Sequence, residues 1–284
     1  MRSVLDFRAR LYDRCVLTAR TIVDGDAVTV ADVACSHRAG RGDEEQSAAH
    51  MLVFVRRGCF FRSADGVESL LDPTLAYATN PGDEQRIDHP QSRGDDCTAV
   101  WLDAGLVASL WGGEPMLPSG PLPVSPEIDL EHRLLLGAAR RGTDPAELEE
   151  RAIALASGTL ELRDARRLAA GRPSTNRARR ALADGARELL AEDPGRGLPD
   201  LARALAVSPH HLSRVFRTLT GHTISRHRMR LRARAAMERM AGGDDNLARL
   251  AADLGFTDQS HLCRVVRDET GRTPSALRRA LSRK

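Results

Sequence analysis

Two stretches near the C-terminal end of the chain repeat one pattern: LARALAVSPHHLSRVFRTLTG spans residues 201–221, and LARLAADLGFTDQSHLCRVVRDETG spans residues 247–271. Leu201 matches Leu250 at an offset of 49 residues, whereas Leu212 matches Leu262 at an offset of 50. The one-residue difference falls between two apolar helical segments, where a turn absorbs an insertion without rotating either apolar face. The pattern therefore predicts a duplicated helix-turn-helix unit.

The second helix of each copy separates an apolar face from a polar one. Ser208-Pro209 supplies an N-cap residue and an N1 proline for this helix in the first copy. The predicted inward positions are Leu212, Val215, Phe216 and Leu219 in the first copy and Leu262, Val265 and Val266 in the second. The other faces carry forked donors and amide or hydroxyl groups, which are the groups that read base edges in the major groove. One arginine-bearing helix is usually only a solvated surface, but two copies in register favour DNA binding.

Charge is divided unevenly along the chain. Residues 177–284 contain 22 basic and 12 acidic residues, a net charge of +10, whereas residues 1–176 contain 20 basic and 27 acidic residues, a net charge of −7. This division indicates that only the C-terminal block faces a polyanion.

The C-terminal block resembles the AraC/XylS family of bacterial transcription regulators. The resemblance lies in residues 201–221, in MRLRARAAMERM (229–240) and in residues 247–279, which contain the family's GF, D-Q-S, ETG and TP elements. It implies two helix-turn-helix units joined by a rigid helix over residues 224–240, which places the reading helices in successive major grooves of one DNA face. Leu262 and Val266 stand where the family commonly has phenylalanine, which affects packing rather than function.

By position, the resemblance and the exposed helix faces assign DNA contacts to eight residues. These are His210, Ser213, Arg214, Arg217, Gln259, Ser260, Cys263 and Arg264. Arg187, on an earlier predicted helix, is expected at most to contact phosphate.

The first hundred residues predict short strands separated by turns. The strand segments are 28–35, 50–55, 59–62, 74–79 and 97–102, and turn signals such as Asp65-Gly66 lie between them. Short strands without intervening helices favour an antiparallel sandwich or a small barrel.

Helical periodicity begins near residue 127. Segments 127–141 and 145–170 predict two helices, with Asp144 as a cap and Pro145 at the first helical position. In the second helix, Leu148, Ala152, Leu155, Thr159 and Leu162 recur at spacings of three and four residues. This stripe either packs on its own domain or forms a dimer seam.

The predicted fold class is therefore α+β: an antiparallel β-sandwich or cupin-like barrel with following helices, and then an all-α domain. The predicted divisions are a cupin-like effector or dimerisation domain at 1–126, a helical dimerisation or packing segment at 127–170, a linker at 171–176 and the DNA-binding domain at 177–284. The cupin-like assignment comes from resemblance to the front domains of the same family.

Five cysteines (Cys15, Cys35, Cys59, Cys97 and Cys263) are scattered and form no C-x-x-C pair, which suits a reducing cytoplasm. No apolar run reaches the length of a membrane span, and the N-terminus lacks the apolar core of a signal peptide.

Soft ligands in the front half raise a metal or redox alternative. The residues concerned are Cys35, His37, His50, Cys59, His89 and Cys97. The His-x-His pattern of metal-binding cupins is absent, although unpaired ligands can converge in space. Ordinary core or loop roles are favoured, so we expect neither a metal nor a cofactor. The nucleophile-elbow, P-loop and dinucleotide motifs of enzymes are missing.

The sequence thus predicts a cytoplasmic, non-enzymatic transcription regulator that binds double-stranded DNA. The expected further partners are a small-molecule effector, a second copy of the chain and, for an activator, RNA polymerase; no membrane is expected. The alternative is a cupin-type metal-dependent enzyme or sensor fused to a DNA-binding module, which bound metal would reveal.

Overall fold

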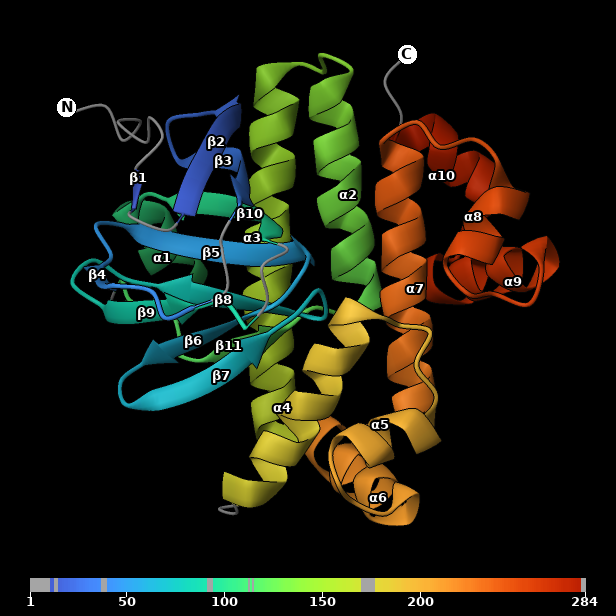
Figure 1. The fold of residues 1–284 in the computed structure, drawn as a ribbon. Coiled ribbons are helices and arrows are strands. Elements are labelled where there is room, and N and C mark those ends of the chain that lie inside the picture. Colours follow the sequence, from blue (N-terminus) through green and yellow to red (C-terminus); the bar gives the residue numbers. More distant parts are fainter. Residues whose placement is uncertain are drawn as a thin grey trace. The chain divides into compact units, whose positions relative to one another are not determined.

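The computed structural model describes residues 11–12, 15–36, 40–90, 94–111, 113, 115–169 and 177–281 (Figure 1). The chain divides into two compact units, residues 1–164 and residues 165–284. The predicted linker at 171–176 lies outside the described residues. The predicted boundaries of the linker and of the domains on either side of it therefore stay a prediction.

Antiparallel strands build the first unit. In chain order they are β1 (Leu11–Tyr12), β2 (Cys15–Asp24), β3 (Val28–Cys35), β4 (Glu44–Gln46), β5 (His50–Arg57), β6 (Phe60–Ala64), β7 (Val67–Leu71), β8 (Leu75–Thr79), β9 (Glu84–Asp88), β10 (Asp95–Leu102) and β11 (Pro121–Pro123). The described strands form a larger sheet in the order β1-β2-β3-β10-β5-β8-β11 and a smaller one in the order β4-β9-β6-β7. All of these neighbours pair antiparallel.

The central strands of the larger sheet, β5, β8 and β10, are buried on both faces. Val53 and Val55 of β5 share one core with Phe60 and Leu71 of the smaller sheet. The other face packs against helices α1 (Ala104–Trp111), α2 (Pro126–Arg140) and α3 (Pro145–Ala169). Alternate residues of a strand point to opposite faces, so one strand supplies both cores. The expected fold class, an antiparallel β region with helices followed by a helical domain, is confirmed, while the cupin likeness stays a prediction.

A tight hairpin joins β6 to β7. Asp65 and Gly66 have φ angles of 51° and 71°, both in the left-handed region. A two-residue hairpin of this kind favours Asp-Gly because the glycine tolerates a positive φ without strain. The turn signal read from the sequence is therefore placed correctly.

Several elements of the first unit escaped prediction. Strands β2, β7 and β9 were not among the predicted segments, and α1 lies between β10 and β11, where no helix was expected. The sequence of β9 is EQRID, which lacks the apolar alternation of a half-buried strand because most of its side chains stay partly accessible.

The apolar stripe of α3 packs within its own unit. Asp144 accepts backbone hydrogen bonds from Ala146 N at 3.0 Å and Glu147 N at 3.3 Å, which caps the helix. Leu148, Ala152 and Leu155 join the core beneath the larger sheet, and Thr159 is also buried. These four positions therefore follow the packing alternative rather than a dimer seam; the side chain of Leu162 lies outside the described ones.

Helices make up the second unit. They are α4 (Arg177–Glu192), α5 (Leu198–Ala204), α6 (Pro209–Thr220), α7 (Ile224–Ala241), α8 (Leu247–Asp253), α9 (Gln259–Thr270) and α10 (Pro274–Leu281). Helix α7 matches the predicted connecting helix, with α5 and α6 at one end and α8 and α9 at the other (Figure 1). Among the described residues, no helix combines the length and apolar character needed to cross a bilayer.

Candidate nucleic-acid interface and ligand pocket

Helix α6 is defined by its caps and its core. The Ser208 hydroxyl accepts a hydrogen bond from His211 N at 3.2 Å, and Gly221, with φ 77°, ends the helix. Leu212 and Phe216 are fully buried in a core shared with α4 and α5. These contacts fix which face of α6 remains at the surface.

Helix α9 repeats the design of α6 down to individual hydrogen bonds. Asp258 accepts from His261 N at 2.7 Å, and Gly271, with φ 68°, ends the helix. The Thr270 hydroxyl donates to Val266 O at 2.7 Å, and Thr220 of the first copy donates to Phe216 O at 2.8 Å. The repeat in the sequence is therefore also a structural repeat.

The turns between the paired helices differ by one residue. Val207 N donates to Ala202 O at 3.0 Å in the first copy, and Phe256 N donates to Ala251 O at 2.9 Å in the second. The cap then follows directly as Ser208 in the first copy, but Asp258 is preceded by the additional Thr257. The predicted insertion thus lies in the turn, and both helix pairs keep the same packing.

The predicted DNA contacts all lie on accessible parts of the two second helices. His210, Arg214, Arg217, Gln259, Ser260 and Arg264 are exposed, and Ser213 and Cys263 are half-buried. None of them is used in the core, so all remain available to a groove. Their contacts with particular bases stay predictions.

Arg187 occupies a different environment from the one expected for a phosphate contact. Its side chain is buried on α4, and Nη1 pairs with Asp184 Oδ1 at 3.1 Å. Helical periodicity turns this position toward the core, and a phosphate contact by Arg187 stays a prediction.

The helix that follows each reading helix begins at a capping threonine that sequence reasoning missed. Thr273 caps α10 by accepting from Ala276 N at 3.3 Å, and Thr223 caps α7 by accepting from Arg226 N at 3.2 Å. Thr273 and Ser275 border the same surface hollow as Gln259 and Arg264. The signal was present in the sequence, since a Gly-x-Thr triplet ends both copies of the repeat.

Two arginines of α7 contact the loop before α5, and one of them also reaches the turn between α8 and α9. Arg232 Nε donates to Pro194 O, in the loop before α5, at 3.1 Å. Its Nη1 donates to Gly255 O, in the turn between α8 and α9, at 2.6 Å. Arg228 donates to the same loop at Pro194 O and Gly195 O. Burial lowers the pKa of Arg232, and neighbouring Arg228 adds to this shift. One guanidinium group therefore bridges both helix-turn-helix units.

The acidic pair at the end of α9 is divided between inside and outside. Glu269 Oε2 lies 3.8 Å from Arg230 Nε of α7, and both side chains are largely buried. Asp268 is exposed. Glu269 thus helps to fix α9 on α7, and Asp268 adds negative charge to the outer surface.

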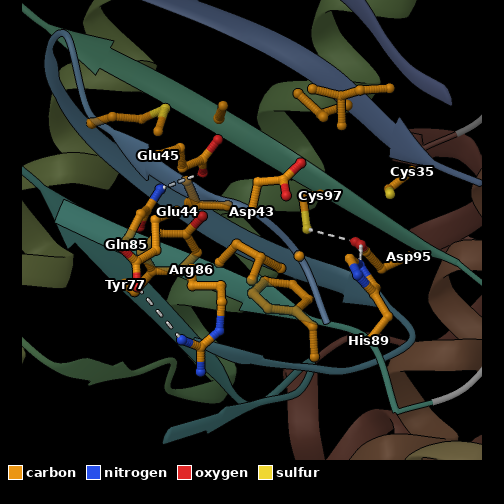
Figure 2. Close-up of a pocket in the computed structure, with 18 of the residues that line it drawn as sticks. Cys35, Asp43, Glu44, Glu45, Tyr77, Gln85, Arg86, His89, Asp95 and Cys97 are labelled. Carbon is orange, nitrogen blue, oxygen red and sulfur yellow. Dashed lines mark hydrogen bonds and ion pairs between the residues drawn. The ribbon is translucent and has the colours of Figure 1, made fainter. Parts of the chain in front are cut away.

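A pocket of about 780 Å³ lies between the two sheets of the first unit (Figure 2). Apolar side chains that include Val53, Phe60 and Trp101 line its wall. Glu45 and Gln85 lie toward one side, where Gln85 Nε2 donates to Glu45 Oε1 at 2.9 Å, and Cys97, Asp95 and His89 gather on the other (Figure 2). This is a partly open site whose apolar wall also carries polar and charged groups, and a concave, largely apolar lining with a few polar groups is the usual form of a small-molecule site.

The soft-ligand candidates from the sequence separate into two groups. Cys35, His89 and Cys97 line this pocket. His50 instead contacts Asn80, with Nδ1 3.1 Å from Oδ1, Cys59 is buried outside the pocket lining, and His37 lies outside the described residues. Burial raises the pKa of the Cys97 thiol well above its ordinary value, and Asp95 adds to the shift. A protonated thiol is a poor nucleophile, so Cys97 does not fit a thiol switch.

Comparison with known proteins places the helical unit. Residues 201–280 match the family profile described as a helix-turn-helix domain. The C-terminal unit is an AraC-type helix-turn-helix domain. The match runs from α5 into α10, so the AraC-type domain includes both reading helices and the helix that connects them.

Relatives of the AraC-type domain include regulators. The regulatory protein PocR of Salmonella typhimurium is 31% identical over 85 residues, which are 30% of this chain and 28% of PocR. The chain thus matches less than a third of this curated relative's length. ToxT from Vibrio cholerae O395 aligns at 11% identity over 90% of this chain and 99% of ToxT, with a TM-score of 0.35. An AraC-type regulator from Chromobacterium violaceum aligns at 22% identity over 37% of this chain and 95% of that chain, with a TM-score of 0.34.

Proposed function

We propose that the protein is a sequence-specific transcription regulator that reads two successive major-groove boxes with α6 and α9. The observation that carries this proposal is the structural repeat: two reading helices with equivalent caps and cores, each with an accessible polar face. A helix-turn-helix unit places its second helix in the major groove. Two such units on one rigid frame read two segments of one site.

Arg214 and Arg264 are the residues that we expect to dominate base reading. They are equivalent at an offset of 50 residues, and both are exposed. Arginine pairs in bidentate fashion with guanine O6 and N7, which is the commonest specific contact in the major groove. We propose His210, Ser213, Arg217, Gln259, Ser260 and Cys263 as the surrounding contacts.

The connecting helix sets the distance between the boxes. Helix α7 has 18 residues, which corresponds to a length of about 27 Å. With the width of the packed units added, the reading helices can lie about 34 Å apart, so the boxes are centred about 10 base pairs from each other. The site need not be palindromic, because α6 carries HHLSR and α9 carries QSHLCR.

The pocket between the sheets supports control by a small molecule. Its apolar wall and its two groups of polar side chains suit an effector with an apolar body and polar ends. A second copy of the chain and, for an activator, RNA polymerase stay predicted partners. Because the target is chromosomal DNA, the proposed activity belongs in the cytoplasm, and none of it requires catalysis.

The test begins with selection of binding sites from random DNA by the full-length chain. Arg214→Ala and Arg264→Ala should each weaken binding to the selected site by about 1–3 kcal/mol and relax base preference in one box only. Arg180→Ala, an exposed arginine on α4, is the matched control and should leave base preference unchanged. Equal weakening on selected and random DNA would show that both arginines contact phosphate and would contradict base reading.

A further inference from the structure

Three potential metal ligands of different chemistry meet at one side of the pocket (Figure 2). Cys35 ends β3, Asp95 begins β10, and the register of these strands places the two opposite each other. His89 follows β9 directly, and its Nε2 lies 3.3 Å from Asp95 Oδ2. One ligand atom from each of Cys35, His89 and Asp95 lies within 4.8 Å of the others.

The cluster is buried, and a carboxylate, a thiol and an imidazole are rarely found together in an apolar core. Cys35, His89 and Asp95 are 8%, 6% and 5% exposed, respectively. A buried carboxylate is costly unless it is paired or coordinates a metal. The contact with His89 accounts for one oxygen of Asp95, and the Cys97 thiol lies 4.0 Å from the other. Thiol, imidazole and carboxylate together are the donor set of zinc sites.

We propose that Cys35, His89 and Asp95 bind one Zn²⁺ ion. Tetrahedral zinc holds N, O and S ligands at about 2.0–2.3 Å, which puts neighbouring ligand atoms about 3.3–3.8 Å apart. Side-chain movements of about 1 Å would therefore close the observed cluster to that geometry. The thiol of Cys35 loses its proton to solvent as the sulfur–zinc bond forms, whereas Asp95 binds as a carboxylate and His89 as neutral imidazole.

The fourth position of such an ion would face the pocket, because all three ligands line it. An ion with three protein ligands keeps a position open for water or for a donor atom of a bound molecule. The ion would also connect the two sheets, since Cys35 and Asp95 belong to the larger sheet and His89 follows a strand of the smaller one. Metal binding at this place can be measured without DNA, so its test is separate from that of the proposed function.

The test uses the full-length chain freed of metal by a chelator and titrated with Co²⁺ as a spectroscopic probe, followed by Zn²⁺. We expect one Co²⁺ per chain, a thiolate-to-metal charge-transfer band, visible bands of tetrahedral cobalt, and displacement of both by Zn²⁺. Absence of the charge-transfer band in the unmodified chain would overturn the proposal, whatever the variants do.

Variants then locate the site. Cys35→Ala should abolish the charge-transfer band, and His89→Ala should weaken Co²⁺ binding at least about tenfold, because loss of an outer-shell partner alone typically costs about 10–100-fold in metal affinity. Cys59→Ala, which removes a buried thiol outside the pocket lining, is the matched control and should leave both unchanged. Zn²⁺ should raise the midpoint of thermal unfolding of the unmodified chain and of Cys59→Ala, but not of Cys35→Ala. A band that persists in Cys35→Ala would overturn the assignment.

Discussion

The two helix-turn-helix units have the same helix caps and backbone contacts but differ in their core, turn and surface side chains. The first helix-turn-helix unit, α5 and α6, has Phe216 in its core and Ala206 in its turn. Its reading helix carries only two arginines or acidic residues, Arg214 and Arg217. In the second helix-turn-helix unit, valine and glycine occupy the equivalent core and turn positions, and the exposed Asp268 adds a negative charge beside Arg264 and Arg267. Caps and backbone contacts are common to both.

This difference separates the requirements of folding from those of reading. The features shared by the units are those that hold a second helix against its partner. The features that differ lie on the accessible surface, or change the volume of one core. We therefore expect the units to contribute unequally to stability and to DNA affinity, with the first unit stronger in both.

Substitutions at the equivalent core positions should give the largest difference in stability between the two helix-turn-helix units. Phe216 and Val266 are equivalent and both fully buried. Phe216→Ala should lower the free energy of unfolding by about 3–5 kcal/mol, because it removes a ring from a closed core. Val266→Ala removes two methyl groups and should cost about 2 kcal/mol. Chemical denaturation of the two variants measures both; equal losses would contradict the unequal cores.

Substitutions in the two turns should change the free energy of unfolding by an intermediate amount and in opposite directions. Ala206 has φ 53° and Gly255 has φ 70°, so both occupy the left-handed region. Gly255→Ala should cost about 1–2 kcal/mol, and its new Cβ would lie 3.1 Å from Arg232 Nη2. Ala206→Gly should stabilise by roughly 0.5–1 kcal/mol, since relief of strain exceeds the entropy cost of glycine. Thermal unfolding should show the shifts in opposite directions, and shifts of the same sign would refute the comparison.

These contrasts also mark how far the sequence alone reaches. Local signals placed β3 and the start of α6, because Ser208 and Pro209 begin a helix wherever it packs. The repeat in the sequence correctly predicted which faces of α6 and α9 are accessible, because the apolar positions of each helix recur in both copies. The polar strand β9 escaped because its pairing with β4 and β6, rather than an apolar alternation, makes it a strand, and a local pattern does not contain that pairing.

The pocket cluster shows the same limit for sites. Cys35 and His89 were visible as candidates, but Asp95 was not among them. Asp95 joins Cys35 only through the register between β3 and β10, which pairs these two residues although they are 60 positions apart in the chain. Likewise, the role of Arg232 depends on two carbonyl groups from distant turns. Contacts of this kind follow from tertiary structure rather than from spacing.

Asp268 offers the smallest expected effect. Its equivalent in the first unit is Thr218, and both are exposed. Asp268→Thr removes one negative charge near the phosphate backbone and should raise affinity for selected and random DNA alike, by about 0.3–1 kcal/mol at low salt. Thr218→Ser is the matched control and should change neither affinity. Titrations at two salt concentrations should show that the gain shrinks at high salt; a gain confined to the selected site would point to base reading at Asp268 instead.

The central claim is that two units held at a fixed distance read one site. Its most direct test is the affinity of the full-length chain for the selected site with five or ten base pairs inserted between the boxes. Because α7 and Arg232 join the units rigidly, both insertions should lower affinity by at least about 2 kcal/mol, toward that for a single box. Unchanged affinity after the five-base-pair insertion, or recovery after the ten-base-pair insertion, would contradict a rigid two-box reader.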